Sequence, residues 1–276
     1  MVLLSVPFDA SRARRQSAPW SAGLVTAAAT TAVAGGALAV EMLWGGWLGA
    51  IGRAVAGAAM HTGFLTLGWI LVFGRFPSWG GPIFWSAAVL LLASVTSRFT
   101  IWGSLLYLIL PGLLLHAGSR HPALRGMGVS LKAGLKPIAL GLAAGAFLGA
   151  HLLISASLTL GYGVRVMDPT LYLAAASYDL GASALSAEWL FRGAMFSHLW
   201  RRWEFWPAAS ASTALAVVRY LLDPALPATL EVRAGAVFYM ALLGYGSCAL
   251  RASSGSLLPG YLATVVFFLA YRTLAQ

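Results

Sequence analysis

Several charged or titratable residues of this sequence lie inside long apolar stretches. An ionisable side chain is costly in hydrocarbon, so each such residue is a candidate for a functional or pairing role. A buried carboxylate can serve as a general base, and an arginine can hold a carboxylate or stabilise a developing negative charge. The candidates are Glu41, Asp179, Glu188, Arg192 and Arg219, with the lone histidines His61, His151 and His198 as weaker ones.

The spacing of these residues predicts which of them share a helix face. Glu188 and Arg192 are four residues apart, so on one helix they lie on the same face and can pair. Asp179 precedes Glu188 by nine residues, which is about half a turn round a regular helix, and we expect it to face elsewhere. Glu41 lies near the end of its apolar stretch, where its side chain can reach the interface.

Depth in the membrane favours a second partner for Glu188. Glu188 lies thirteen residues before the basic turn at Arg201, and Arg219 lies thirteen residues after Trp206. At about 1.5 Å per residue, two antiparallel helices would place both side chains roughly 20 Å from the same membrane face. We therefore predict that Glu188 pairs with Arg192, Arg219 or both. Such a pair is compatible with a purely structural role as well as with chemistry.

The elements that position these residues are predicted to be transmembrane helices. Of the 276 residues, 59% are hydrophobic and 9% are charged, whereas soluble domains carry about 25% charged residues. Apolar stretches of about 20 residues, the length that a bilayer core requires, recur along the chain. The fold class is therefore an all-α polytopic bundle of about nine helices, with eight as the alternative. The predicted spans are 21–44, 55–74, 82–97, 100–117, 137–160, 170–199, 207–222, 231–250 and 256–274.

The charge distribution predicts the orientation of the chain. With nine spans, eleven Lys and Arg residues fall on one side and five on the other, and the remaining two are Arg192 and Arg219. The more basic side is normally cytoplasmic, which places the N-terminus in the cytoplasm. The basic residues lie in short clusters between apolar runs, so the net charge of +10 does not indicate a nucleic-acid partner. We predict a multi-pass protein of the cell membrane, and size and composition favour a bacterial inner membrane.

Two further features concern packing and domain organisation. Gly141, Gly145 and Gly149 repeat every four residues on one helix face, which predicts close approach of a neighbouring helix. The single cysteine, Cys248, excludes a disulfide within the chain. We divide the chain into a cytoplasmic segment (1–20), N-terminal transmembrane helices (21–160) and a C-terminal transmembrane core (161–276).

The C-terminal core resembles the CPBP family of intramembrane proteases, also called CAAX-type or Abi proteins. The segment Ala187-Glu188-Trp189-Leu190-Phe191-Arg192-Gly193 is similar to the first motif of the family, usually EELLFRG. Trp206-Pro207 and the helix after it stand where the family has its second motif, Phe-x-x-x-His. Gly255-Ser256-Leu257-Leu258-Pro259 resembles the lead-in to the third motif, His-x-x-x-Asn/Asp. The resemblance covers roughly residues 170–276 and implies an intramembrane endopeptidase that activates water, often with a metal.

Departures from the family pattern fall on the residues that would carry this chemistry. The first glutamate is replaced by Ala187, and the second-motif histidine falls on Arg219. The two polar positions of the third motif fall on Thr264 and Phe268. Only Glu188 and Arg192 are retained, and an arginine that stays protonated cannot act as a base.

These departures favour a catalytically degenerate family member that works as a membrane binding or assembly factor. The first alternative is an active endopeptidase with Glu188 as general base and Arg219 as oxyanion stabiliser. The second is a transporter or channel, which would need a more polar path than these spans offer. We expect no cofactor, with zinc only in the protease alternative. Expected partners are the lipid bilayer and either another membrane protein or a transmembrane peptide substrate.

Overall fold

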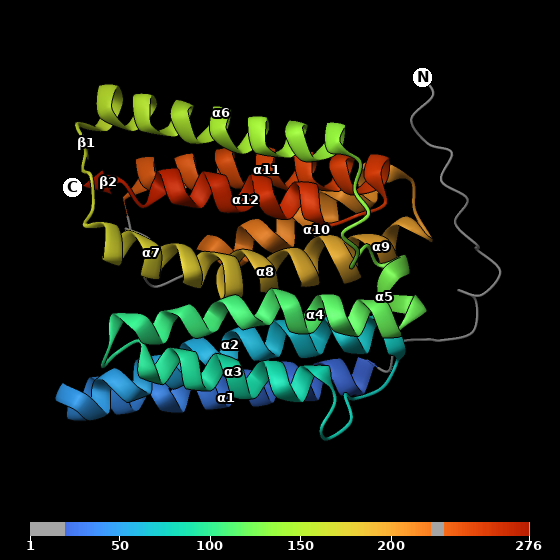
Figure 1. The fold of residues 1–276 in the computed structure, drawn as a ribbon, viewed down its shortest axis with the longest axis horizontal. Helices are drawn as coiled ribbons and strands as arrows, with labels where there is room; N and C mark the ends of the chain where they lie inside the picture. The colour runs from blue at the N-terminus through green and yellow to red at the C-terminus, as the bar shows by residue number, and fades with distance from the viewer. Residues whose placement is uncertain (1–19, 222–228, 276) are drawn as a thin grey trace. The chain divides into compact units, whose positions relative to one another are not determined.

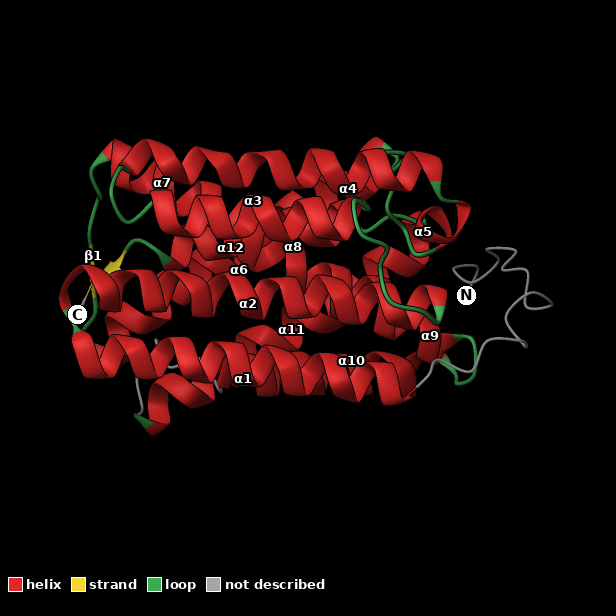
Figure 2. Cartoon of the chain, turned by 90° about the horizontal axis from the view of Figure 1, so that it is seen from below, coloured by secondary structure: helices red, strands yellow, loops and turns green. Residues whose placement is uncertain are grey.

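The fold is helical throughout the part of the chain that the structure describes. The computed structural model describes residues 20–221 and 229–275. Figure 2 shows helix along most of these residues, and two short strands among them, β1 (Gly163–Val164) and β2 (Leu274–Ala275), pair antiparallel. The predicted all-α fold is confirmed. Residues 1–19 of the predicted cytoplasmic segment, with their three arginines, lie outside the described residues.

Each of the nine predicted spans overlaps helix. Within residues 20–221 and 229–275, four helices are long and apolar enough to cross a membrane: Ser21–Trp44, Gly46–Phe73, Ile101–Arg120 and Leu135–Leu160. Two further apolar helices, Pro82–Thr96 and Leu258–Tyr271, are shorter. These lengths associate the chain with a membrane, because a hydrocarbon core needs about 20 residues of helix. Nine crossings and the orientation of the chain stay predictions.

The chain divides into two compact units, which we describe separately. Among the described residues, the first unit comprises 125–166, 191–221 and 229–275, and the second comprises 20–124 and 167–190. The helices of the second unit begin with α1 (Trp20–Trp44), α2 (Gly46–Phe73), α3 (Pro82–Thr96), the 3-10 helix η2 (Ile101–Leu108) and α4 (Ile109–Arg120). The main helices of the first unit are α6 (Leu135–Leu160), α9 (Phe196–Trp200), α10 (Phe205–Leu221), α11 (Leu230–Ser254) and α12 (Leu258–Tyr271). The predicted boundary at residue 160 stays a prediction.

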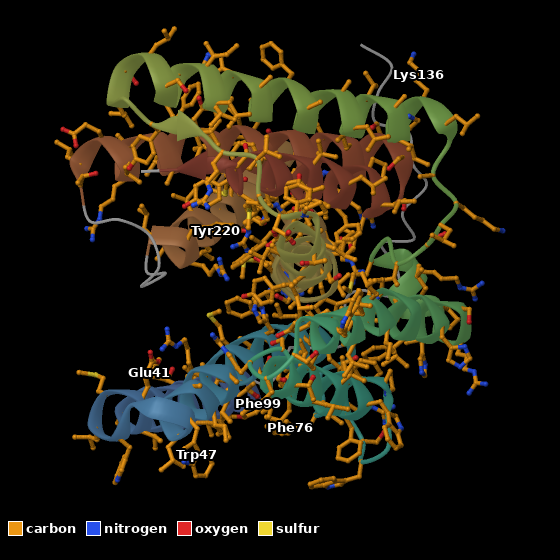
Figure 3. All side chains as sticks on the ribbon, turned by 60° about the vertical axis from the view of Figure 1, so that its left-hand side comes forward. Glu41, Trp47, Phe76, Phe99, Lys136 and Tyr220 are labelled. Carbon is orange, nitrogen blue, oxygen red and sulfur yellow. The ribbon has the colours of Figure 1, made fainter. Side chains whose placement is uncertain are left out.

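In the second unit, α1 and α2 form a tight hairpin. Gly45 connects them with a φ of 55°, a conformation that favours glycine. At Gly52 a Cβ would lie 2.4 Å from the carbonyl oxygen of Ala37, so the two backbones are in direct contact. Across this hairpin Arg53 Nη2 lies 2.8 Å from Glu41 Oε1 (Glu41 is labelled in Figure 3). Because α2 begins nine residues earlier than predicted, Glu41 has an ion-pair partner on the same hairpin.

In the first unit, α6 and α12 pack through the glycine repeat that the sequence predicted. A Cβ at Gly141 would lie 2.2 Å from the carbonyl oxygen of Pro259, and one at Gly145 would lie 2.4 Å from that of Ala263. At Gly149 the corresponding contact is Ala270 Cβ at 2.7 Å. Figure 1 shows α6 running alongside α12 over most of the length of α12. The predicted close approach is confirmed.

Candidate functional site

The residues of the first motif lie on one continuous helical segment, Pro169–Trp200, which we call the motif helix. Asp168 caps its start by accepting hydrogen bonds from the backbone N–H groups of Thr170 (2.8 Å) and Leu171 (3.4 Å). The Thr170 hydroxyl and these backbone bonds hold the pKa of the Asp168 carboxyl below its usual value. Pro169 occupies the first turn, where a missing N–H leaves no hydrogen bond unmade.

Two π-helical segments interrupt the motif helix, and the sequence did not predict them. They are η3 (Asp179–Ser183) and η4 (Glu188–Met195), separated by the short α8 (Ala184–Ala187) and preceded by α7 (Pro169–Tyr178). A π segment replaces i→i+4 hydrogen bonds by i→i+5 bonds and is frequent at functional sites. The half-turn separation expected between Asp179 and Glu188 assumed a regular helix, and it stays a prediction. Both side chains are buried, with exposed fractions of 1% and 2%.

Packing against η2 positions η3. At Gly181 a Cβ would lie 2.0 Å from the carbonyl oxygen of Tyr107, so only glycine lets the two backbones approach this closely. The Tyr107 hydroxyl lies 2.8 Å from Ser94 Oγ of α3, in an O–H···O hydrogen bond. The π segment Asp179–Ser183 therefore packs on the backbone of Tyr107, whose hydroxyl is hydrogen-bonded to Ser94.

The boundary between the two units falls within η4, after Leu190. Ala187 and Glu188 lie in the second unit, whereas Arg192, Arg219, Thr264 and Phe268 lie in the first. The pairing of Glu188 with Arg192 or Arg219 stays a prediction. Ala187, Glu188, Arg192, Thr264 and Phe268 are all buried, and Arg219 is half-buried.

In the second unit, α2 contacts the motif helix through His61, which the sequence analysis gave as a weaker functional candidate. His61 Nδ1 lies 2.8 Å from Ser186 Oγ, and His61 Nε2 lies 2.9 Å from the Tyr178 hydroxyl. Both ring nitrogens therefore contact hydroxyl groups of the motif helix. No spacing rule could identify these contacts, because His61 and Ser186 are 125 residues apart.

A third hydrogen bond between these helices lies one turn further along α2. Trp189 Nε1 donates to the carbonyl oxygen of Leu65 at 3.0 Å. Its indole ring lies against Gly68, where a Cβ would come within 2.2 Å of Nε1. Trp189, the residue next to Glu188, is therefore held in a space that a residue larger than glycine at position 68 would fill.

In the first unit, Arg192 lies where α10 and α11 cross. A Cβ at Gly244 would lie 3.0 Å from Arg192 Nη2 and 2.5 Å from Thr213 Cγ2, so glycine leaves the space that the guanidinium occupies. The Ser212 hydroxyl donates to the carbonyl oxygen of Phe191 at 2.6 Å. This bond provides a donor for a carbonyl of the π segment, whose hydrogen bonding differs from that of a regular helix.

Aromatic packing surrounds the positions of the second and third motifs. The guanidinium carbon of Arg219 lies 4.4 Å from the centre of the neighbouring Tyr220 ring, within range of a cation–π contact. Tyr220 and Phe268 meet edge to face with ring centres 5.7 Å apart. Thr264, one turn before Phe268 on α12, is 4% exposed. The side chain at the last third-motif position therefore packs against the residue that follows Arg219.

The remaining histidine candidates, His151 and His198, both lie in the first unit. His151 is exposed on α6, and its Nδ1 lies 2.8 Å from the Tyr239 hydroxyl of α11. His198 is half-buried on α9. Among residues 20–221 and 229–275, no three His, Cys, Asp or Glu side chains lie close enough together to hold a metal ion. The expectation of no zinc stays a prediction.

Comparison with known proteins identifies no relative of this chain. No protein-family model, no curated protein and no solved structure matches it. The resemblance to CPBP proteases therefore stands on the motif residues themselves. Those residues, together with the packing described above, are the basis for a proposal about function.

Proposed function

We propose that this chain is a catalytically degenerate relative of the CPBP intramembrane proteases that works as a binding or assembly factor in a membrane. We place it in a bacterial inner membrane as a multi-pass protein with a cytoplasmic N-terminus. In this proposal the motif helix is retained as a packing element. Its partner is another membrane protein or a transmembrane segment.

The observation that carries this proposal is the contact between Phe268 and Tyr220 beside Arg219. Peptide hydrolysis by an activated water needs a base, and it needs donors or a metal to hold the developing oxyanion. Phe268 supplies neither, and its ring meets that of Tyr220 at 5.7 Å. Arg219 stays protonated and cannot serve as a base. An aromatic pair at this place supports a packing role for these positions.

Cleavage and association can be measured on the same preparation. The full-length chain is purified in native-lipid nanodiscs, incubated with a pool of transmembrane peptides and analysed by mass spectrometry. We expect the wild type to produce no peptide fragments beyond those seen with the Glu188→Gln variant. We also expect one membrane protein to co-purify with the wild type and with the variant at a stoichiometric ratio. Fragments that the wild type produces and Glu188→Gln does not would overturn the degenerate assignment. A chain that purifies without a stoichiometric partner would contradict the assembly role.

A second candidate function is an intramembrane hydrolase with Ser186 as nucleophile. The observation that favours it is the 2.8 Å contact between Ser186 Oγ and His61, whose other ring nitrogen contacts Tyr178 at 2.9 Å. A nucleophile, a base and a group that orients the base form the arrangement needed to activate a serine. It ranks second because Ser186 and His61 are only 2% and 1% exposed, whereas attack requires a substrate at Oγ. Labelling by a fluorophosphonate that Ser186→Ala abolishes and Ser183→Ala does not would establish it.

A further inference from the structure

A buried arginine lies near the C-terminal end of α11, in the first unit. Arg251, near the end of α11, is 6% exposed. Its Nε–H donates to the carbonyl oxygen of Met127 at 3.1 Å, and an Nη2–H donates to that of Gly126 at 2.7 Å. Gly128, with φ of +97°, lies directly against the guanidinium, and a Cβ there would come within 2.5 Å of Nε. The backbone of this loop is shaped around the Arg251 side chain.

Two backbone carbonyl groups accept the hydrogen bonds that the structure describes for Arg251. Within the described residues, no carboxylate forms an ion pair with it. Arg251 follows the predicted span 231–250, and burial, with a smaller contribution from the neighbouring Arg201 charge, lowers its pKa to about 10. It is therefore protonated at neutral pH. A buried cation without a counter-charge is unfavourable, and carbonyl dipoles offset only part of that cost.

The segments around Arg251 are basic, and hydrogen bonds join two of them, 125–136 and 251–257. The Leu257 N–H donates to the carbonyl oxygen of Gly128 at 2.9 Å, and the Ser256 hydroxyl donates to that of Ser130 at 2.6 Å. Together the segments 125–136, 198–205 and 251–257 form what we call the basic end. Its basic side chains are Arg125, Lys132, Lys136, Arg201, Arg202 and Arg251, and its acidic side chain is Glu204. Lys136, at the start of α6, is labelled in Figure 3 and is exposed.

We propose that the basic end binds a phosphate group, supplied by an anionic phospholipid headgroup or by free phosphate, with Arg251 and Arg201 as its principal ligands. A guanidinium has five N–H donors in a planar fork that matches phosphate oxygens, and two of those of Arg251 are donated to the Gly126 and Met127 carbonyls. The two neighbouring arginine charges favour a dianionic or monoanionic group over a neutral one. Basic pockets at the cytoplasmic ends of transmembrane helices are typical binding sites for anionic lipids.

The experiment compares lipid binding by the wild type and three variants of the full-length chain. Native mass spectrometry of detergent-solubilised protein is titrated with phosphatidylglycerol, with phosphatidylcholine and with inorganic phosphate alone. Arg201→Gln removes the exposed arginine of the pair, and Arg251→Lys keeps the buried charge while losing the planar fork of N–H donors. Arg233→Gln is the matched control, because it removes the same charge from the opposite end of α11.

We expect phosphatidylglycerol to bind the wild type more tightly than phosphatidylcholine. Arg201→Gln and Arg251→Lys should each weaken that binding by roughly ten- to hundredfold, the effect of losing a charge-assisted hydrogen bond. Arg233→Gln should bind as the wild type does. Competition by inorganic phosphate at millimolar concentration would support the site with free phosphate as its ligand. Equal binding of the two lipids without competition by phosphate, or equal losses in all three variants, would overturn the proposal.

Discussion

The packing of α6 on α12 gives the sharpest prediction about stability, through the substitution Gly145→Ala. A Cβ at this position would lie 2.4 Å from the carbonyl oxygen of Ala263 and 2.9 Å from its Cα. Ordinary contacts of a Cβ begin at 3.4 Å, so the contact with the oxygen is 1.0 Å too short (3.4 − 2.4). Both atoms belong to the backbone of α12, and no side-chain rotation can relieve the clash. The two helices must separate.

The magnitude follows from two opposing effects. Overpacking of a tight interface costs about 1–3 kcal/mol. Replacing a glycine by alanine inside a helix is favourable by roughly 0.5–1 kcal/mol when the space is free. We therefore expect Gly145→Ala to lower the free energy of unfolding by about 1–2 kcal/mol. In the same unit, Gly246 of α11 has no atom within 4 Å of its ideal Cβ, so Gly246→Ala should raise that free energy by roughly 0.5–1 kcal/mol.

The free energies of unfolding can be measured by titrating the full-length chain with a denaturing detergent in mixed micelles, followed by tryptophan fluorescence. Each variant adds one methyl group to a glycine inside a helix, so any general effect of alanine on helix stability cancels when the two are compared. The result that would refute the reasoning is a Gly145→Ala protein as stable as Gly246→Ala. That outcome would mean that α6 does not approach the backbone of α12 at this position.

Three further predictions concern polar and charged groups. If Glu188 pairs with Arg219, Glu188→Leu and Arg219→Leu should each destabilise the chain by up to about 3–5 kcal/mol, the range for a fully buried pair, and the double variant by less than either. Additive losses in a double-mutant cycle would contradict the pairing. His61→Leu should cost about 1–2 kcal/mol, because the buried Ser186 hydroxyl and the half-buried Tyr178 hydroxyl each lose one hydrogen-bond partner. Unchanged unfolding in the same detergent titration would show that these bonds do not stabilise the fold. Asp168 has a lowered pKa in the folded chain, so its charged form stabilises the fold above about pH 4, and this stabilisation is lost as the pH falls through the folded pKa. Asp168→Asn should remove this part of the pH dependence of the free energy of unfolding. An identical pH profile in the variant would contradict the prediction.

The sequence specified the features that depend on local composition. The helical spans follow from the length of the apolar stretches, because a backbone in hydrocarbon must satisfy its own hydrogen bonds. The repeat of Gly141, Gly145 and Gly149 specified a close helix contact, because only glycine leaves room for another backbone on that face. The burial of Glu188 and Arg192 also agrees with the apolar surroundings from which they were chosen.

Tertiary structure decided which helix faces meet. Transmembrane helices are apolar on nearly every side, so their hydrophobic pattern does not show which face packs against a neighbour. For this reason the contacts of His61 with Ser186 and of Arg251 with Gly126 could not be read from spacing, since each joins residues about 125 positions apart. The π segments η3 and η4 likewise lie in a stretch whose composition predicts an ordinary helix. Helix content depends on local composition, whereas buried polar groups can pair only after the helices have packed together.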